Sequence, residues 1–300
     1  TAIMGAAENN SNPDVLRVLL DEGADVEARS KDGVTAIMMA SGLNSNPEVL
    51  RVLLDEGADL ETRTKDGGTA LIQAAIYNDN PDVLHLLLDT GVDVEARNKE
   101  GVTALMAAAA YNSNPDVLHA LLDAGADLEA RNNIGWSALM GAARYNSNPD
   151  ALRVLLDAGA DVGARSKGGA TALMGAATFN TRPDVLRVLL DAGANVEARH
   201  KDGATALMGA ATFNTSPDVL RVLLDAGADV GARSKRGLTA LMGAARYNSN
   251  PDMVRVLLDA GADPNAEMPA GFTALDFAEV NEDIRGSDVY WRLHDASFED

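Results

Sequence analysis

The segment at residues 171–204 reads TALMGAATFNTRPDVLRVLLDAGANVEARHKDGA, and it returns 34 residues later as TALMGAATFNTSPDVLRVLLDAGADVGARSKRGL. The same unit begins, always 34 residues apart and without insertion, at Thr1, Thr35, Thr69, Thr103, Ser137, Thr171, Thr205, Thr239 and Thr273. A constant period of this length is typical of stacked-repeat proteins, in which each unit contacts only its neighbours. The sequence therefore predicts a single repeat array over residues 1–300.

Each unit is predicted to form two short helices. In the first copy, Thr1 is a candidate N-cap for a helix of small residues, and Asn10 is predicted to end that helix in the left-handed conformation. Asn12-Pro13-Asp14 opens the second helix, and Gly23 ends it. Isolated helices shorter than about 12–15 residues are marginal in water, so these helices must bury their apolar faces on the neighbouring copies.

The composition limits the classes of partner. The chain has 25 basic and 45 acidic side chains and a net charge of −20, which disfavours binding to nucleic acids and to anionic membrane surfaces. It contains no cysteine, which excludes disulfides and Cys-ligated metals. The sequence shown carries no signal peptide and no membrane-spanning run of about 20 apolar residues. We therefore expect a cytoplasmic monomer that binds a protein.

The unit resembles the ankyrin repeat. The resemblance rests on Gly-Val-Thr-Ala-Ile-Met at residues 33–38, Val-Leu-Leu at residues 52–54 and Gly-Ala-Asp at residues 57–59, and it recurs along the whole chain. It implies an all-α solenoid of stacked helix-turn-helix units joined by β-hairpin loops, acting as a non-catalytic protein-binding scaffold. Tetratricopeptide repeats share the 34-residue period but lack the Gly-Ala-Asp segment and want a Trp/Gly/Tyr pattern that is missing here.

The chain departs from the ankyrin pattern in three ways. The unit has one residue more than the family's usual 33, placed between the two helices, and the family's Pro is Ala in every copy. The family's His, which links neighbouring loops, is replaced in most copies by Met, as in Met38 and Met208. We therefore expect apolar packing to replace a polar link between copies.

The two ends of the array differ. Residues 273–300 are predicted to form a C-terminal cap, with Asp276 and Glu279 at apolar positions and Tyr290, Trp291 and Leu293 anchoring a final helix. The first copy keeps Ile3 and Met4 and shows no such polar change. We expect that an N-terminal cap is absent, because either the native chain continues upstream or this surface meets another molecule.

Residues at one repeat position form a column along the stack, and four columns are candidates for partner contact. The first is basic and lies in the hairpin loops, where residues 163–170 carry a net charge of +2 and residues 231–238 one of +3. Its candidate contacts for an acidic segment are Arg165, Lys167, Arg233, Lys235 and Arg236. The alternative is a ladder of weak Arg–Glu salt bridges.

The second column is aromatic and lies near the end of the first helix: Leu43, Tyr77, Tyr111, Tyr145, Phe179, Phe213 and Tyr247. These side chains could line a concave groove, or they could form a ladder packed between copies. A nearby column contains glycine in five copies, at Gly5, Gly141, Gly175, Gly209 and Gly243. Glycine costs about 0.5–1 kcal/mol relative to alanine in a helix, which suggests close approach by the next copy or by a partner.

The strongest single candidate is Trp136. Together with Ile134 it places apolar side chains at a hairpin tip that is charged in other copies. We predict a binding hot spot that also includes Arg131, Arg144, Tyr145 and Tyr111. The alternative is that the Trp136 ring lies flat over the adjacent hairpins.

Catalytic motifs are missing from the sequence. It has no phosphate-binding glycine loop, no H-E-x-x-H and no G-x-S-x-G, and His85 and His119 would need further ligands to hold a metal. We predict no catalytic residues, metal or cofactor. Two other classes stay open: a structural or engineered scaffold without a dedicated partner, because the copies are so alike, and an enzyme or small-molecule binder, which would need a polar pocket interrupting the stack.

Overall fold

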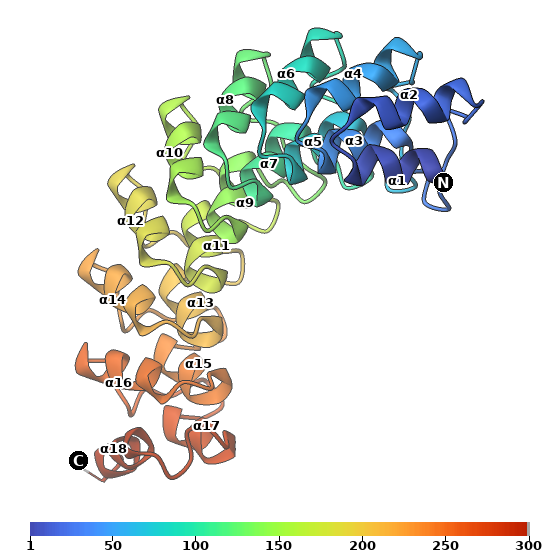
Figure 1. Ribbon diagram of the computed structural model, residues 1–300. Coiled ribbons are helices and arrows are strands. Elements are labelled where there is room, and N and C mark those ends of the chain that lie inside the picture. Colours follow the sequence, from blue (N-terminus) through green and yellow to red (C-terminus); the bar gives the residue numbers. More distant parts are fainter. Residues whose placement is uncertain (299–300) are drawn as a thin grey trace. The chain divides into compact units, whose positions relative to one another are not determined.

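The computed structural model describes residues 1–298, and those residues form helices and turns without a strand. It contains two compact units (Figure 1). Unit 1 comprises Thr1–Ala142 and Arg153–Ala160, and unit 2 comprises Ala143–Leu152 and Asp161–Asp300. The division falls within the copy that begins at Ser137.

Every copy contains a first helix and a second helix. The first helices are α1 (Ala2–Asn9), α3 (Ala36–Leu43), α5 (Ala70–Tyr77), α7 (Ala104–Tyr111), α9 (Ala138–Tyr145), α11 (Ala172–Phe179), α13 (Ala206–Phe213), α15 (Ala240–Tyr247) and α17 (Ala274–Val280). The second helices are α2 (Pro13–Asp21), α4 (Pro47–Asp55), α6 (Pro81–Asp89), α8 (Pro115–Asp123), α10 (Pro149–Asp157), α12 (Pro183–Asp191), α14 (Pro217–Asp225), α16 (Pro251–Asp259) and α18 (Asp288–Ala296).

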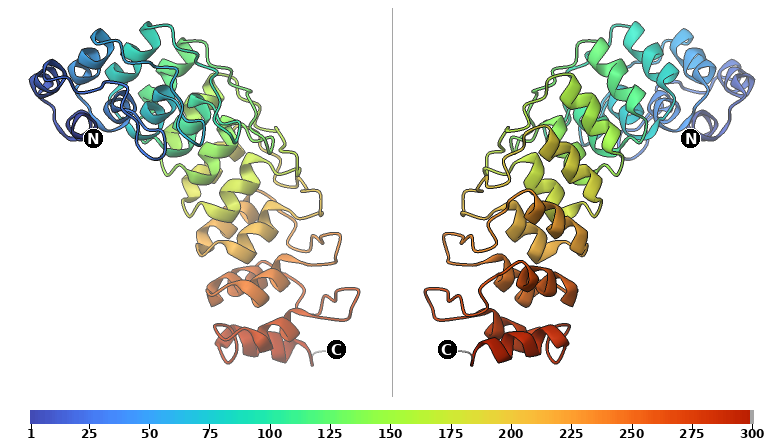
Figure 2. Two further views of the ribbon diagram at one scale, coloured as in Figure 1. Left: turned by 90° about the vertical axis from the view of Figure 1, so that its right-hand side faces the viewer. Right: turned by 90° about the vertical axis from the view of Figure 1, so that its left-hand side faces the viewer.

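Within each unit the helices stack as the repeat period predicts. In unit 2, α11, α13, α15 and α17 pack in one row, and α12, α14, α16 and α18 pack in a second row (Figures 1 and 2). The hairpin loops are tight turns; in one of them the Ser234 N–H donates to the Leu238 carbonyl at 3.0 Å. Most Ala, Leu and Met side chains of the first helices are almost completely buried, whereas Leu43 is exposed. The predicted all-α fold is therefore confirmed.

The helix ends follow the sequence signals. The Thr103 hydroxyl accepts a hydrogen bond from the Met106 N–H at 3.4 Å, which caps α7 as predicted. The Asn12 side chain accepts from the Asp14 N–H at 3.0 Å and opens α2 before Pro13. Gly23, with φ +88°, follows the end of α2 in the left-handed region. These signals recur in most of the first eight copies, whose helices begin and end at the same repeat positions.

The asparagine that ends each first helix does not adopt the predicted conformation. Asn214 has φ −85° and ψ 145°, which is extended rather than left-handed. Its Nδ2 donates to the carbonyls of Ala177 and Asn180 in the preceding copy, both at 2.9 Å, and its Oδ1 accepts from the Ser216 N–H at 2.9 Å. The asparagine therefore supplies a polar link between copies at a second repeat position, while Met208, at the position of the family's His, is buried. The same double donation is made by Asn44, Asn78, Asn112, Asn180, Asn248 and Asn281.

The last copy is modified, and one expectation for it was wrong. Asp276 accepts from the Thr273 N–H at 2.7 Å and so completes a capping box at the start of α17. Leu293 is only 1 % exposed and anchors α18, and Tyr290 is half-buried. Trp291 is 53 % exposed and does not anchor the helix. It lies on the side of α18 away from the buried Leu293.

The asparagine links are expected to contribute measurably to stability. Asn214→Ala removes three hydrogen bonds and leaves two carbonyls of the preceding copy without this donor, so the free energy of unfolding should fall by about 2–4 kcal/mol. Urea denaturation followed by circular dichroism measures the change. The neighbouring Thr215→Ala, at an exposed side chain, is the control, and equal destabilisation by both substitutions would contradict a role for the links.

Candidate interaction groove in unit 2

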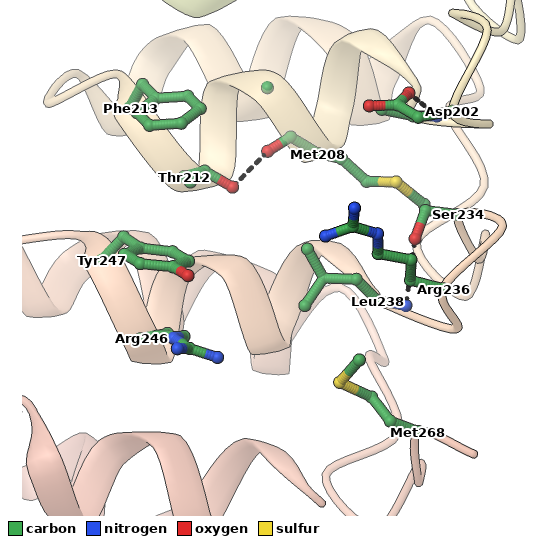
Figure 3. Close-up of a pocket in the computed structure, with 12 residues that line it drawn as sticks. Asp202, Met208, Thr212, Phe213, Ser234, Arg236, Leu238, Arg246, Tyr247 and Met268 are labelled. Atoms are coloured by element: carbon green, nitrogen blue, oxygen red, sulfur yellow. Dashed lines mark hydrogen bonds between the residues drawn. The ribbon is translucent and has the colours of Figure 1, made fainter. Parts of the chain in front are cut away.

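A groove of about 450 Å³ lies in unit 2 between the first helices and the hairpin loops (Figure 3). Its walls come from α13, from the end of α15 and from three successive hairpins. The residues that line it are Asp202, Ala204, Met208, Gly209, Thr212, Phe213, Ser234, Arg236, Leu238, Arg246, Tyr247 and Met268. It therefore combines apolar side chains with two arginines.

Helical periodicity explains the α13 wall of the groove. Met208 and Thr212 are four residues apart, as are Gly209 and Phe213, and side chains at this spacing share one face of a helix. Met208 and Thr212 are buried, whereas Phe213 is exposed. The wall therefore has a packed apolar base and an aromatic edge that faces solvent.

The glycine column is explained by close packing between copies. A Cβ added to Gly243 would lie 2.4 Å from the Thr212 Oγ1, and one added to Gly209 would lie 2.4 Å from the Thr178 Oγ1. The Thr212 hydroxyl is held in place because it donates to the Met208 carbonyl at 2.7 Å. At these two positions it is the preceding copy, rather than a partner, that requires glycine.

The two arginines of the groove lack acidic partners. Neither Arg236 nor Arg246 has a carboxylate oxygen within 4.0 Å among residues 1–298. Both side chains are exposed. The Arg246 guanidinium carbon lies 5.0 Å from the Tyr247 ring centroid and 4.9 Å from that of Phe277, within cation–π range. The aromatic rings therefore hold Arg246 without neutralising its charge.

Asp202, the one acidic residue that lines the groove, is held by its own loop. Its carboxylate lies 2.9 Å from the His200 Nδ1 and accepts from the Ala204 N–H at 3.0 Å. Partial burial acts to raise the pKa of the Asp202 carboxyl, but the hydrogen bonds from Ala204 and His200 outweigh it, and the pKa lies below its usual value. Asp202 therefore stays ionised at neutral pH and leaves both arginines unpaired.

Two of the predicted hairpin arginines, Arg165 and Arg233, already bind the next hairpin. The Nη1 of Arg165 donates to the Arg199 carbonyl at 2.7 Å, and that of Arg233 donates to the Glu267 carbonyl at 2.5 Å. Arg131 donates to the Gly135 carbonyl at 3.3 Å. The alternative of Arg–Glu pairs is realised in part, at Arg131–Glu129 (3.1 Å) and Arg97–Glu95 (3.7 Å). Partner contact by Arg131, Arg165 and Arg233 stays a prediction. Lys167 and Lys235 are exposed at the same hairpin edge.

The aromatic column faces solvent. The six aromatic side chains Tyr77, Tyr111, Tyr145, Phe179, Phe213 and Tyr247 are between 49 % and 65 % exposed. In unit 1, Tyr77 and Tyr111 line a smaller hollow of about 230 Å³ with Ile76. In unit 2, the Arg144 guanidinium carbon lies 3.4 Å from the Phe179 ring centroid, an arrangement similar to that of Arg246. Exposure of this kind leaves the rings available to a second molecule.

The residues of the predicted hot spot are divided between the two units. Ile134, Trp136, Arg131 and Tyr111 belong to unit 1, and Arg144 and Tyr145 belong to unit 2. Ile134 is 56 % exposed, and Trp136 is half-buried, with its backbone N–H donating to the Asn132 Oδ1 at 2.9 Å. The joint hot spot stays a prediction. Sequence reasoning missed Arg246, although the motif Ala-Ala-Arg-Tyr-Asn occurs at residues 142–146 and again at residues 244–248.

A family model described as "Ankyrin repeats (3 copies)" matches residues 3–98, 74–166, 139–234 and 207–285. The chain belongs to the ankyrin-repeat family. Among solved structures, it is similar to the crystal structure of the human ASB11 ankyrin repeat domain, with 22 % sequence identity and a TM-score of 0.65. The match covers 76 % of this chain and 99 % of that chain, and it supports the fold alone. A comparison with curated proteins gave no significant match.

The described part of this ankyrin-repeat chain shows neither a metal-binding cluster nor a membrane-spanning helix. Across residues 1–298, no group of three or more His, Asp or Glu side chains is arranged to hold a metal ion. In the same described part of the chain, no helix has the length and apolar character needed to cross a membrane.

The packing beneath the groove predicts a coupled pair of substitutions. Gly243→Ala alone should lower the free energy of unfolding by about 1–3 kcal/mol, because the new methyl group meets the Thr212 hydroxyl. In a Thr212→Ala background the same change should be neutral or stabilise by about 0.5–1 kcal/mol through helix propensity. A double-mutant cycle in urea measures the coupling. Additive effects would show that the two residues do not constrain each other.

Proposed function

We propose that this ankyrin-repeat chain is a non-catalytic scaffold that binds a protein partner through its hairpin tips and the exposed face of its first helices. Ankyrin repeats are in general protein–protein interaction modules. The observation that carries the proposal here is the column of exposed aromatic side chains beside a groove with unpaired arginines. Aromatic and arginine side chains are the residues most enriched in binding hot spots.

The face is better suited to holding a molecule than to transforming one. Arg236, Arg246, Asp202 and Tyr247 are the ionisable groups that line the groove. Among the described residues, the His200 ring is the ionisable side chain within hydrogen-bond distance of the Asp202 carboxylate. Acid–base catalysis needs a positioned donor or acceptor with an available proton at the reacting atom. Exposed rings and guanidinium groups instead supply area and charge for contact.

A structural or engineered scaffold without a dedicated partner is the second candidate. It is favoured by the likeness of the copies: residues 171–179 and residues 205–213 have the same sequence. A scaffold that only spans distance would gain nothing from unpaired arginines on one groove. The two candidates are separated by whether a defined protein binds this face.

A capture experiment tests the scaffold proposal. The intact chain and a Phe213→Ser/Tyr247→Ser variant are used as baits in extract from the source cells, with Arg187→Ser on the second-helix face as a control. We expect a defined protein to be retained by the intact and control chains and lost from the aromatic variant. Equal recovery from all three baits would contradict binding through the first-helix face.

Trp136 tests the contribution of the hairpin tips. Trp136→Ala should weaken binding of the captured partner at least about tenfold, because a large apolar contact is removed, while the circular dichroism spectrum persists. His119→Ala, at an exposed position on α8, is the control. Titration calorimetry with the purified partner measures both affinities, and an unchanged affinity for Trp136→Ala would remove this residue from the interface.

A further inference from the structure

We propose that the groove in unit 2 binds an extended acidic segment of the partner, which places one apolar side chain between α13 and the hairpins and directs carboxylates to Arg236 and Arg246. This inference rests on the proposed scaffold function and adds the chemistry of the bound segment. It concerns the groove residues in Figure 3 and no other surface.

Arg236 and Arg246 carry positive charges that the chain leaves without a carboxylate partner among the described residues. On the second helices, arginines are neutralised within one turn: Arg187 lies 2.7 Å from Asp184, and Arg221 lies 2.6 Å from Asp218. In a chain with 45 acidic residues, Arg236 and Arg246 nevertheless lack a carboxylate partner among residues 1–298. The hairpin at residues 231–238 has a net charge of +3, from Arg233, Lys235 and Arg236. This local charge is opposite to that of the chain and complements an acidic segment.

The Arg246 cation is preorganised by aromatic rings. Arg246 lies over Tyr247 and near Phe277, and Phe277 is itself buried and stacked with Phe272 at 5.9 Å between ring centroids. A guanidinium held by aromatic rings loses less side-chain freedom when it binds, and its planar edge matches a carboxylate. Arg246 is therefore a better carboxylate contact than a free surface arginine.

The groove has a shape and lining that suit one apolar side chain. Its volume of about 450 Å³ is in the range of sites that enclose a small organic group. Met208, Leu238 and Met268 line it, and methionine side chains adapt to irregular apolar surfaces. The Thr212 hydroxyl is already used by the Met208 carbonyl, and the Ser234 hydroxyl by the Leu238 N–H at 3.1 Å. The interior of the groove therefore suits an apolar side chain, and its charged edges suit flanking carboxylates.

A phosphate backbone could also contact two arginines. The net charge of −20 opposes approach of a nucleic acid to the chain as a whole, whereas a short acidic peptide brings far less charge. The apolar lining also has no counterpart in a sugar–phosphate backbone. A peptide is therefore the occupant that satisfies both the charge and the lining.

The test uses a synthetic fluorescein-labelled peptide of about ten residues, long enough to span the groove when extended. It carries Asp and Glu on both sides of a central Leu. Matched peptides replace the acids by Asn and Gln, or the Leu by Ala. Fluorescence anisotropy measures their dissociation constants for the intact chain and for Arg236→Gln, Arg246→Gln and Arg221→Gln. The last variant removes the same charge from the second-helix face and is the matched control.

The proposal expects the acidic Leu peptide to bind and to lose at least about tenfold in affinity with Arg236→Gln or Arg246→Gln, but little with Arg221→Gln. The Ala peptide and the amide peptide should each bind at least about tenfold more weakly than the acidic Leu peptide. Equal losses with all three arginine variants would indicate unspecific charge attraction and overturn the proposal. Tighter binding of a labelled single-stranded oligonucleotide than of the peptide would overturn it as well.

Two further outcomes separate this inference from the scaffold proposal. If the captured partner binds the intact chain but is unaffected by Arg236→Gln and Arg246→Gln, and the acidic peptide does not compete with it, the groove chemistry proposed here is wrong and the scaffold function stands. If no partner is lost from the Phe213→Ser/Tyr247→Ser bait, but the acidic peptide binds as expected, the groove is a peptide site and the wider first-helix interface is wrong. Thermal unfolding of each variant establishes that the chain remains folded.

Discussion

The stability of every element depends on burial against the neighbouring copies. The helices contain seven to nine residues, which is too few for a helix to persist alone in water. Their Ala, Leu and Met faces reach near-complete burial only because the next copy covers them. Close contact between copies then requires small side chains, and Gly243 against Thr212 shows how little space is left. The same closeness brings the asparagine amides within reach of the carbonyls of the preceding copy.

This dependence divides the side chains of each first helix into two sets. Residues that face the row are small and apolar, and variation there is limited by packing. Residues near the end of the helix, such as Phe213 and Arg246, face outward beside the hairpins and are not needed to complete the core. A repeat protein can therefore vary its contact surface without loss of fold.

The sequence predicted the fold in detail because its signals are local and repeated. The cap at Thr103, the Asn12-Pro13 helix start and the glycine after each second helix act within one or two turns, and the structure has them as predicted. The conformation of Asn214 could not be predicted in this way, because its side-chain amide donates both of its hydrogen bonds to carbonyls that lie 34 or more residues away in the sequence. Trp291 was misplaced for a similar reason: its exposure depends on which face of α18 meets α17 and α16.

The candidate site was predictable only in part. The columns of arginine and aromatic residues were visible from the period alone, but their roles depend on what each side chain meets. Arg233 and Arg236 are three residues apart in one hairpin, yet Arg233 donates to the Glu267 carbonyl, whereas Arg236 lines the groove without a carboxylate partner in the described chain. The spacing of arginines in the sequence does not distinguish a guanidinium that bridges two hairpins from one that faces an apolar groove. It is the difference between satisfied and unsatisfied cations, rather than the number of cations, that marks a surface for an acidic partner.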